Sequence, residues 1–199
     1  MFAGIGDMFG YTPGSIDDLY YWPLDLDADN GEKYRPVYPE AMDRSLRIVH
    51  ASNHRMFKGT RFLIDAVEQL RAEGEAVELV LVERMSNVEA LETYRSADVI
   101  FDQCLMGNYG YFALEGMALG KPVMCFIRHP QQYVPHLDEC PIINTHVSSL
   151  KQDIRAVLRQ REQLPLLGKR GRAYVERHFS LPAFADRLGA TYSRLGVGL

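Results

Sequence analysis

Short apolar runs alternate with longer amphipathic stretches along most of the chain. Five runs have the length of buried strands, and they fall at residues 46–51, 77–82, 98–103, 123–127 and 142–144. Between and after them, apolar residues recur at helical spacing at residues 58–72, 111–119, 148–161, 165–177 and 181–195, and Ser86 with Glu89 forms a capping box that opens a further helix. Strands alternating with helices predict an α/β fold, with a parallel sheet, helices on both faces and the tail helices packed across it.

Residues 98–126 carry the clearest local pattern. An apolar strand is followed by a turn broken by Gly107 and Gly110, a helix, and a stop formed by Gly120, Lys121 and Pro122. In such a unit the first helix amides have no intrahelical partner and lie at the positive end of the helix dipole, above the carboxyl edge of the sheet. We therefore expect an anion to bind beside Gly110.

Glu115 follows about one and a half turns into this helix. Helical side chains lean toward the helix N-terminus, so the carboxylate can reach the same edge, where it can only accept hydrogen bonds. Amides for phosphate beside an acceptor for hydroxyl groups suit a ribose that carries a diphosphate. The alternative is a solvated surface glutamate, because glycine-rich turns and exposed glutamates are common.

Two cations follow the first predicted strand. Arg55 and Lys58 should lie on the same carboxyl edge as the Gly110 turn, because the ends of parallel strands meet there. Guanidinium and ammonium groups pair well with phosphate oxygens. The pair therefore fits a diphosphate site, although either residue alone would be an ordinary surface base.

Composition restricts the class of protein. At 199 residues and 47% hydrophobic content, the chain can bury one ordinary core. Residues 1–44 are rich in Gly, Pro, Asp and Tyr without sustained periodicity, so we expect a linker or irregular arm, whose Tyr20, Tyr21 and Trp22 pack on a domain formed by residues 45–199. No apolar run reaches membrane-spanning length, which predicts no transmembrane segment.

Charge and reactive side chains exclude several functions. Residues 151–179 carry an excess of basic side chains but no nucleic-acid motif, so a solvated helix face is favoured over contact with nucleic acid or acidic lipid. The three cysteines lack close pairing, which indicates reduced thiols in a cytoplasmic protein, with peripheral membrane contact left open. The six histidines include no helical metal-binding pair, and no nucleophile constellation is recognisable. We therefore predict no metal site and no nucleic-acid partner.

Three segments carry a family resemblance: residues 55–59 (RMFKG), 97–123 (ADVIFDQCLMGNYGYFALEGMALGKPV) and 167–192 (LGKRGRAYVERHFSLPAFADRLGATY). They resemble segments of retaining glycosyltransferases with the GT-B fold, in the large glycogen-synthase-like family 4. The first segment is similar to that family's basic pair before a Lys-Gly helix start, the second to its central motif segment, and the third to its terminal helices. The resemblance covers residues 46–195 and implies the C-terminal, donor-binding half of that fold, which is a Rossmann-like α/β domain.

The resemblance implies a role for each candidate residue. Glu115 falls on the second motif glutamate, which binds the ribose hydroxyls of the donor. Gly110 and Tyr111 fall on the turn whose amides meet phosphate and sugar. Arg55 and Lys58 fall on the side chains that grip the diphosphate of a nucleotide-diphosphate sugar, with no cofactor required.

Several features depart from the family pattern. Gly107 stands where the first motif glutamate, which contacts the transferred sugar, is usual, and Gln103 with Cys104 replaces Pro-Ser. A first Rossmann-like domain, which supplies the acceptor site in this family, has no counterpart in residues 1–44. The resemblance therefore implies the donor-binding half of a hexosyltransferase, with the acceptor domain supplied in cis or in trans.

Two other classes remain as alternatives. A non-catalytic nucleotide-binding or scaffold domain could retain this half-fold after losing the sugar contact at Gly107. A flavodoxin-like regulator would place a carboxylate cluster after the first strand, where His50, Ser52 and Asn53 stand instead.

Overall fold

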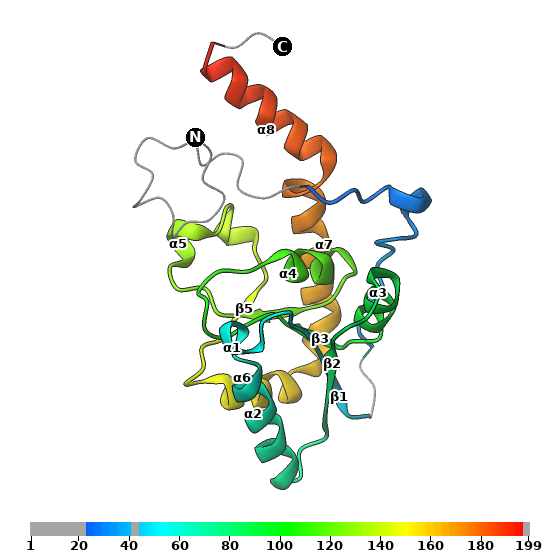
Figure 1. The fold of residues 1–199 in the computed structure, drawn as a ribbon, viewed down its shortest axis with the longest axis vertical. Helices are drawn as coiled ribbons and strands as arrows, with labels where there is room; N and C mark the ends of the chain where they lie inside the picture. Colours follow the sequence, from blue (N-terminus) through cyan, green and yellow to red (C-terminus); the bar gives the residue numbers. More distant parts are fainter. Residues whose placement is uncertain (1–22, 41–43, 197–199) are drawn as a thin grey trace.

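The computed structural model of the chain describes residues 23–40 and 44–196. Its centre is a five-stranded sheet in the order β2-β1-β3-β4-β5, in which every strand pair is parallel (Figure 1). The strands are β1 (Leu46–Ala51), β2 (Val77–Val82), β3 (Val99–Phe101), β4 (Val123–Cys125) and β5 (Ile143–Asn144). The predicted α/β, Rossmann-like parallel sheet is confirmed.

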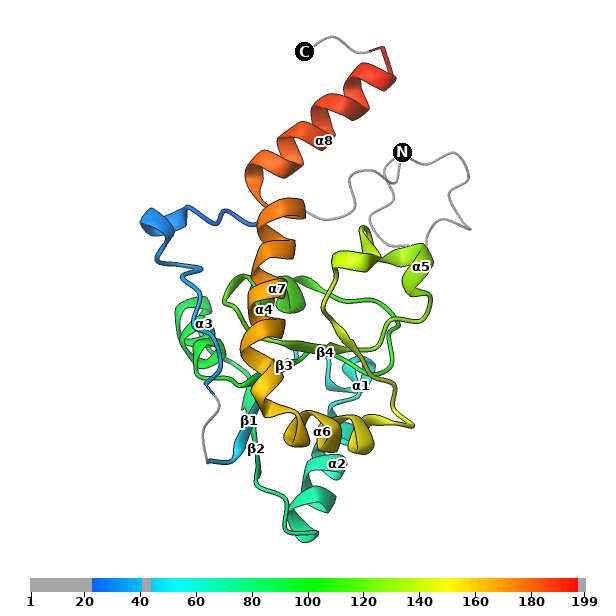
Figure 2. The same cartoon turned by 180° about the vertical axis from the view of Figure 1, so that it is seen from behind.

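Helices cover both faces of this sheet (Figures 1 and 2). One apolar cluster joins Val99 and Phe101 of β3 to α2 (Thr60–Ala72) and α6 (Leu150–Arg159). The other joins Ile100 to α3 (Asn87–Arg95), α4 (Tyr111–Ala118) and α7 (Leu164–His178). Successive side chains of a strand point to opposite faces, so the three consecutive apolar residues of β3 serve two cores.

The predicted capping box is present at the start of α3. Ser86 accepts from the Glu89 amide while Glu89 accepts from the Ser86 amide.

The helix expected over residues 58–72 is instead divided at Gly59 into α1 (Arg55–Lys58) and α2. Gly59 has a left-handed φ of 76°, and a Cβ there would lie 2.5 Å from Cys104 Sγ, so tight packing against the turn after β3 forces the break.

The described part of the arm is irregular and well packed. It contains one short 3₁₀ helix, η2 (Ala28–Gly31), and is anchored at both ends by backbone hydrogen bonds, from Leu24 to Phe179 (2.8 Å) and from Val37 to Leu119 (2.9 Å). Between them Tyr34 is buried. Residues 23–40 therefore extend the core beside α4 and α7; Tyr20, Tyr21 and Trp22 lie outside the described residues.

The C-terminal helices behave differently from each other. α7 packs directly against α4 on one face of the sheet and crosses the domain, as predicted. In contrast, α8 (Leu181–Arg194) projects beyond the end of α7 (Figures 1 and 2). The prediction that all tail helices cross the domain is wrong for α8. The chain turns at Ser180, whose extended backbone pairs with Leu24 and whose side chain caps α8, and this sets the new direction. No helix of the described ranges has the length and apolarity to cross a membrane.

The contact between α4 and α7 depends on a glycine. A Cβ on Gly168 would lie 2.1 Å from the carbonyl oxygen of Gly120, so the two backbones touch there. We expect Gly168→Ala to destabilise the protein by about 3 kcal/mol, because overpacking outweighs the gain in helix propensity. Gly189→Ala in α8 is the control, since its Cβ meets no described atom within 4 Å. Urea denaturation measures both, and equal stabilities would refute the close contact.

Candidate functional site

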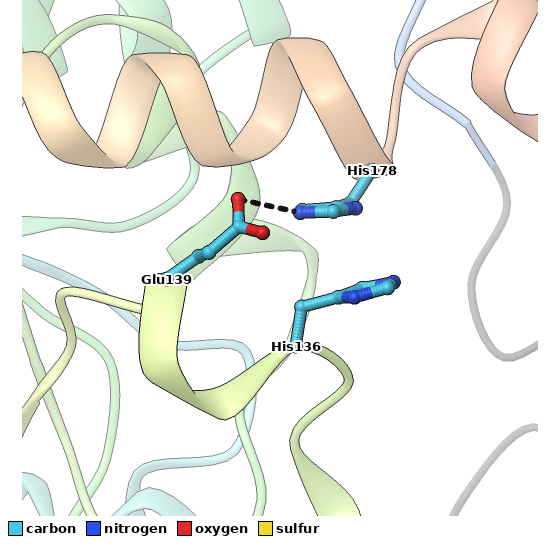
Figure 3. Close-up of side chains that lie close together, drawn as sticks. All are labelled: His136, Glu139 and His178. Atoms are coloured by element: carbon cyan, nitrogen blue, oxygen red, sulfur yellow. Dashed lines mark hydrogen bonds and ion pairs between the residues drawn. The ribbon is translucent and has the colours of Figure 1, made fainter.

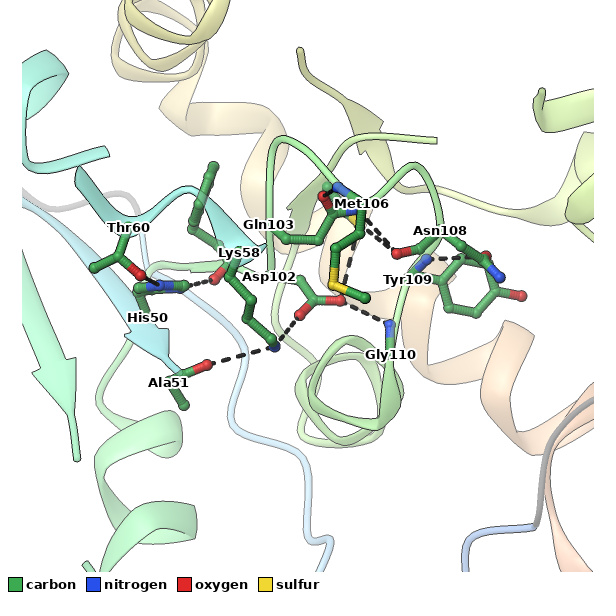
Figure 4. A network of polar contacts seen from close by, with 12 residues as sticks. His50, Ala51, Lys58, Thr60, Asp102, Gln103, Met106, Asn108, Tyr109 and Gly110 are labelled. Atoms are coloured by element: carbon green, nitrogen blue, oxygen red, sulfur yellow. Dashed lines mark hydrogen bonds and ion pairs between the residues drawn. The ribbon is translucent and has the colours of Figure 1, made fainter. Parts of the chain in front are cut away.

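The loops after β1 and β3 form the candidate site at the carboxyl edge of the sheet. α1 follows β1 and carries Arg55 and Lys58, while the turn after β3 leads through Gly110 into α4. β1 and β3 are adjacent and parallel, so these two loops lie side by side (Figure 4). The topology thus brings Lys58 and the start of α4 together, as the sequence predicted.

Asp102 is the centre of this site. Its carboxylate is 1% exposed and binds Lys58 Nζ through Oδ1 (2.6 Å), while Oδ2 accepts from the Gly110 amide (2.8 Å). Lys58 Nζ also lies 3.5 Å from the Ala51 carbonyl oxygen (Figure 4). It lies 5.4 Å from the centre of the Phe112 ring. Asp102 therefore fixes both the cation and the helix entry, a role that the sequence analysis missed.

Arg55 lies at the outer rim of the site. Its Nε and Nη2 atoms bind the two carboxylate oxygens of Glu83, each at 2.6 Å. Glu83 follows β2, and this hydrogen bonding lowers the pKa of its carboxyl group. The pair is exposed, so it is weakly held and can open to admit another anion.

The start of α4 has no side-chain cap among the described residues. Gly110 is its N-cap residue, and Tyr111 begins the helix with a partly exposed side chain. The Gly110 amide donates to Asp102, so one of the amides expected to bind phosphate already has a partner. An anion at this position therefore meets the positive end of the helix dipole with the Asp102 carboxylate close by.

Glu115 lies one turn further along α4, on the side that faces the arm. Its Oε1 accepts a hydrogen bond from the Tyr34 hydroxyl group (3.3 Å), and burial raises the pKa of its carboxyl group, against the opposing effects of Tyr34 and Lys33. Among the described residues, no hydrogen bond or ion pair joins Glu115 to Lys58 or Gly110. The structure therefore gives Glu115 a contact with the arm that is separate from the contacts of Lys58 and Gly110.

The turn between β3 and α4 is held by Gln103. Its side-chain nitrogen donates to the carbonyl oxygens of Asn108 (2.8 Å) and Phe126 (2.6 Å), and its oxygen accepts from the amides of Leu105 (2.8 Å) and Met106 (2.7 Å). Gln103 is fully buried, so these bonds replace those that water would otherwise make. This departure from Pro-Ser thus has a structural role.

Gly107 occupies a place that no other residue fits without strain. Its φ is 85°, and an added Cβ would lie 3.0 Å from the Cβ and 3.1 Å from the Nε of Arg128. The Arg128 guanidinium also lies 3.4 Å from the Met106 carbonyl oxygen. Where the family resemblance expects a carboxylate, this chain therefore has a left-handed glycine covered by a cation.

Two reactive groups near the site are structural. His50 bridges the Phe101 carbonyl and the Thr60 hydroxyl group, both at 2.8 Å, and burial lowers its pKa to about 4, so its ring is neutral at pH 7 (Figure 4). Burial raises the pKa of the Cys104 thiol to about 11, which keeps it protonated. Neither group has the chemistry of a nucleophile or a general base at this edge.

Known structures share this fold. No known protein family and no curated protein matches the sequence. Sucrose-phosphate synthase from Thermosynechococcus elongatus superposes with a TM-score of 0.61 at 20% identity, over 87% of this chain and 51% of that one. A mutant of TarM from S. aureus, in complex with fondaparinux, alpha-GlcNAc-glycerol and UDP, gives 0.58 at 14% identity, over 76% and 36% of the chains. Anabaena HepE in complex with UDP-glucose gives 0.53 at 15% identity, over 75% and 49%.

These similarities define the class of fold. The neighbours are GT-B glycosyltransferases, so the described residues have a Rossmann-like fold of the kind found in those enzymes. The identities are too low to carry a substrate or a residue role from one protein to another. The chain spans between about a third and a half of the length of these neighbours.

Proposed function

We propose that this chain is the donor-binding half of a retaining, family 4-like GT-B glycosyltransferase, which transfers a hexose from a nucleotide-diphosphate sugar. Residues 45–199 form the nucleotide-sugar-binding domain. The observation that carries the proposal is the Lys58 ammonium group, held by Asp102 at the start of α4. A cation beside a helix N-terminus is a suitable environment for a diphosphate.

The contacts of Lys58 leave room for this ligand. An ammonium group has three donors, and Asp102 and Ala51 take two of them, so one remains for a phosphate oxygen. Arg55 can turn from Glu83 to the same diphosphate, because an exposed ion pair contributes less than about 1 kcal/mol. Gly110 and Tyr111 provide the helix start against which the phosphates lie.

Glu115 is the proposed partner of the ribose. Tyr34 occupies Oε1, which leaves Oε2 as the acceptor for a ribose hydroxyl group. The carboxylate is half buried, and hydrogen bonds to charged groups contribute more to stability where water is displaced. The second oxygen is therefore available to a nucleoside whether or not Tyr34 occupies the first.

Exposed side chains at the carboxyl edge of the sheet are consistent with contact to a further domain. Large apolar side chains are exposed on the loops after three adjacent strands: Met56 (79%) and Phe57 (59%) after β1, Met85 (45%) after β2, and Met106 (50%) after β3. Exposed apolar groups gathered at one edge are typical of surfaces that another domain covers. We propose that this domain supplies the acceptor site, in cis or in trans.

Calorimetry with UDP, GDP and ADP, and with inorganic pyrophosphate, tests the proposal. We expect Glu115→Gln to weaken binding of the preferred nucleoside diphosphate about tenfold, since the neutral amide is the weaker acceptor, and to leave pyrophosphate binding unchanged. Tyr34→Phe is the control, because it keeps the packing and removes only the hydroxyl group that shares the carboxylate. We expect it to retain nucleotide binding.

Equal losses for both ligands in Glu115→Gln would remove the ribose role. If the unaltered protein binds none of the three nucleotides at millimolar concentration, the donor-binding proposal fails. The non-catalytic scaffold domain is then the better description. The Arg128 side chain packed over Gly107 would be a structural feature consistent with it.

A further inference from the structure

Three ligating side chains converge away from the candidate donor site. His136 and Glu139 lie in the connection between β4 and β5, and His178 ends α7 (Figure 3). One nitrogen of each histidine and one carboxylate oxygen all lie within 4.8 Å of one another. The group spans exposed, half-buried and buried positions, so it is open to solvent on one side.

Local backbone geometry brings the first two residues together. His136 is the N-cap of the 3₁₀ helix η3 (Leu137–Glu139), with a left-handed φ of 51° and ψ of 52°. The Glu139 amide donates to the His136 carbonyl oxygen (2.9 Å), and this turn brings the two residues close together. A histidine held at positive φ is uncommon and is maintained only where the surrounding structure fixes it.

The charges around the cluster leave one carboxylate oxygen available. His178 Nε2 donates to Glu139 Oε2 at 3.1 Å, and Arg177 forms an ion pair with the same oxygen. Among the described contacts of Glu139, none uses Oε1.

The two histidine rings stack almost in parallel, with centroids 3.8 Å apart and an interplanar angle of 11°. Protonating both rings would place two cations in contact. Neutral imidazole is the form that binds metal ions.

We propose that His136, Glu139 and His178 bind a divalent transition-metal ion of the zinc class, with solvent completing the coordination. Two imidazoles and a carboxylate are a ligand set that zinc accepts. Zinc–ligand bonds of about 2.0–2.2 Å put tetrahedral ligand atoms about 3.4 Å apart, so the cluster must contract by roughly 1 Å. Rotation of the exposed His136 side chain supplies this movement.

Metal binding requires two local exchanges. If the ion takes Nε2 of His178, the single proton of that neutral ring moves to Nδ1. The ion replaces the Arg177 guanidinium as the partner of the Glu139 carboxylate, because a divalent cation is the stronger charge. The bound ion would fasten the β4–β5 connection to the corner between α7 and α8.

The sequence predicted no metal site, and the proposal departs from that prediction. His178 lies 39 residues beyond Glu139, so no short motif reveals the triad. The His-x-x-Glu spacing at residues 136–139 was the available local signal.

Zinc titration of the full chain tests the site by thermal unfolding and calorimetry, since an ion that binds only the folded state raises Tm. We expect micromolar binding, and at least a tenfold loss of affinity in His136→Ala. Arg177→Gln should tighten binding, because it removes the competing cation. His146→Ala alters another exposed histidine, which contacts Ser148, and should leave affinity unchanged.

Cobalt(II) in place of zinc gives visible absorption bands that report tetrahedral coordination, and these bands should disappear in His136→Ala. No binding of zinc or cobalt at micromolar concentration would overturn the proposal. Binding that is equally weakened by His146→Ala and His136→Ala would mean non-specific association, which overturns it as well. Nucleotide binding is measured separately at Lys58 and Glu115, so either proposal can fail without the other.

Discussion

Lys58→Met is expected to lower the free energy of unfolding by about 3 kcal/mol and to abolish binding of both nucleoside diphosphate and pyrophosphate. The stability effect arises because Asp102 is 1% exposed, and removing its cation leaves a buried charge that keeps only the Gly110 amide as a strong partner. The binding effect arises because methionine retains the length of the side chain but offers no donor to phosphate. Urea denaturation and calorimetry measure the two effects independently.

The double variant Lys58→Met/Asp102→Asn separates fold from function. Asparagine can still accept from the Gly110 amide, so removing both charges should recover most of the lost stability while phosphate binding stays absent. The single variant Asp102→Asn should bind pyrophosphate more tightly than the unaltered protein, because Lys58 is no longer offset by a carboxylate. Pyrophosphate binding that survives in Lys58→Met, or returns in the double variant, would remove the proposed phosphate role.

The fold could be predicted because its signals are local. Short apolar runs and helical spacing placed every strand of the sheet, and the capping box at Ser86 marked the start of α3. The division of the first helix at Gly59 could not be predicted, because it results from the packing of that glycine against Cys104, far along the chain. The direction of α8 likewise depends on the pairing of Leu24 with Ser180.

The site was predictable only in its topology. Parallel strand order was enough to place Lys58 beside the Gly110 turn, since both follow adjacent strands. The partners that determine their chemistry come from elsewhere: Asp102 pairs with Lys58, Glu83 with Arg55, and Tyr34 with Glu115. Contacts between distant segments leave no periodicity in a sequence, so the carboxylate partners of the two predicted cations could not be predicted.

The structure gives a physical reason for glycine at position 107. The missing glutamate could be read from the chain, but the left-handed backbone and the Arg128 side chain packed on it could not. A substitution that restores the carboxylate would therefore have to adopt an unfavourable φ and displace Arg128. If a donor sugar binds here, its contacts in this part of the site differ in charge from those that the family resemblance implies.

The residues of this chain alone are expected to bind a nucleotide sugar without transferring its hexose. Positioning of donor and acceptor in reacting geometry can lower a barrier by about 7–11 kcal/mol. In our proposal the described residues form only one wall of such a site, with Met56, Phe57, Met85 and Met106 exposed at its rim. We expect no release of nucleoside diphosphate from UDP-glucose or related donors above background when the purified chain is incubated with candidate acceptors. Addition of an acceptor domain, fused or as a partner chain, should produce turnover, and the same complex carrying Lys58→Met should remain inactive. Efficient transfer by the isolated chain would contradict the half-enzyme proposal, whereas an inactive complex that still binds nucleotide would favour the scaffold alternative.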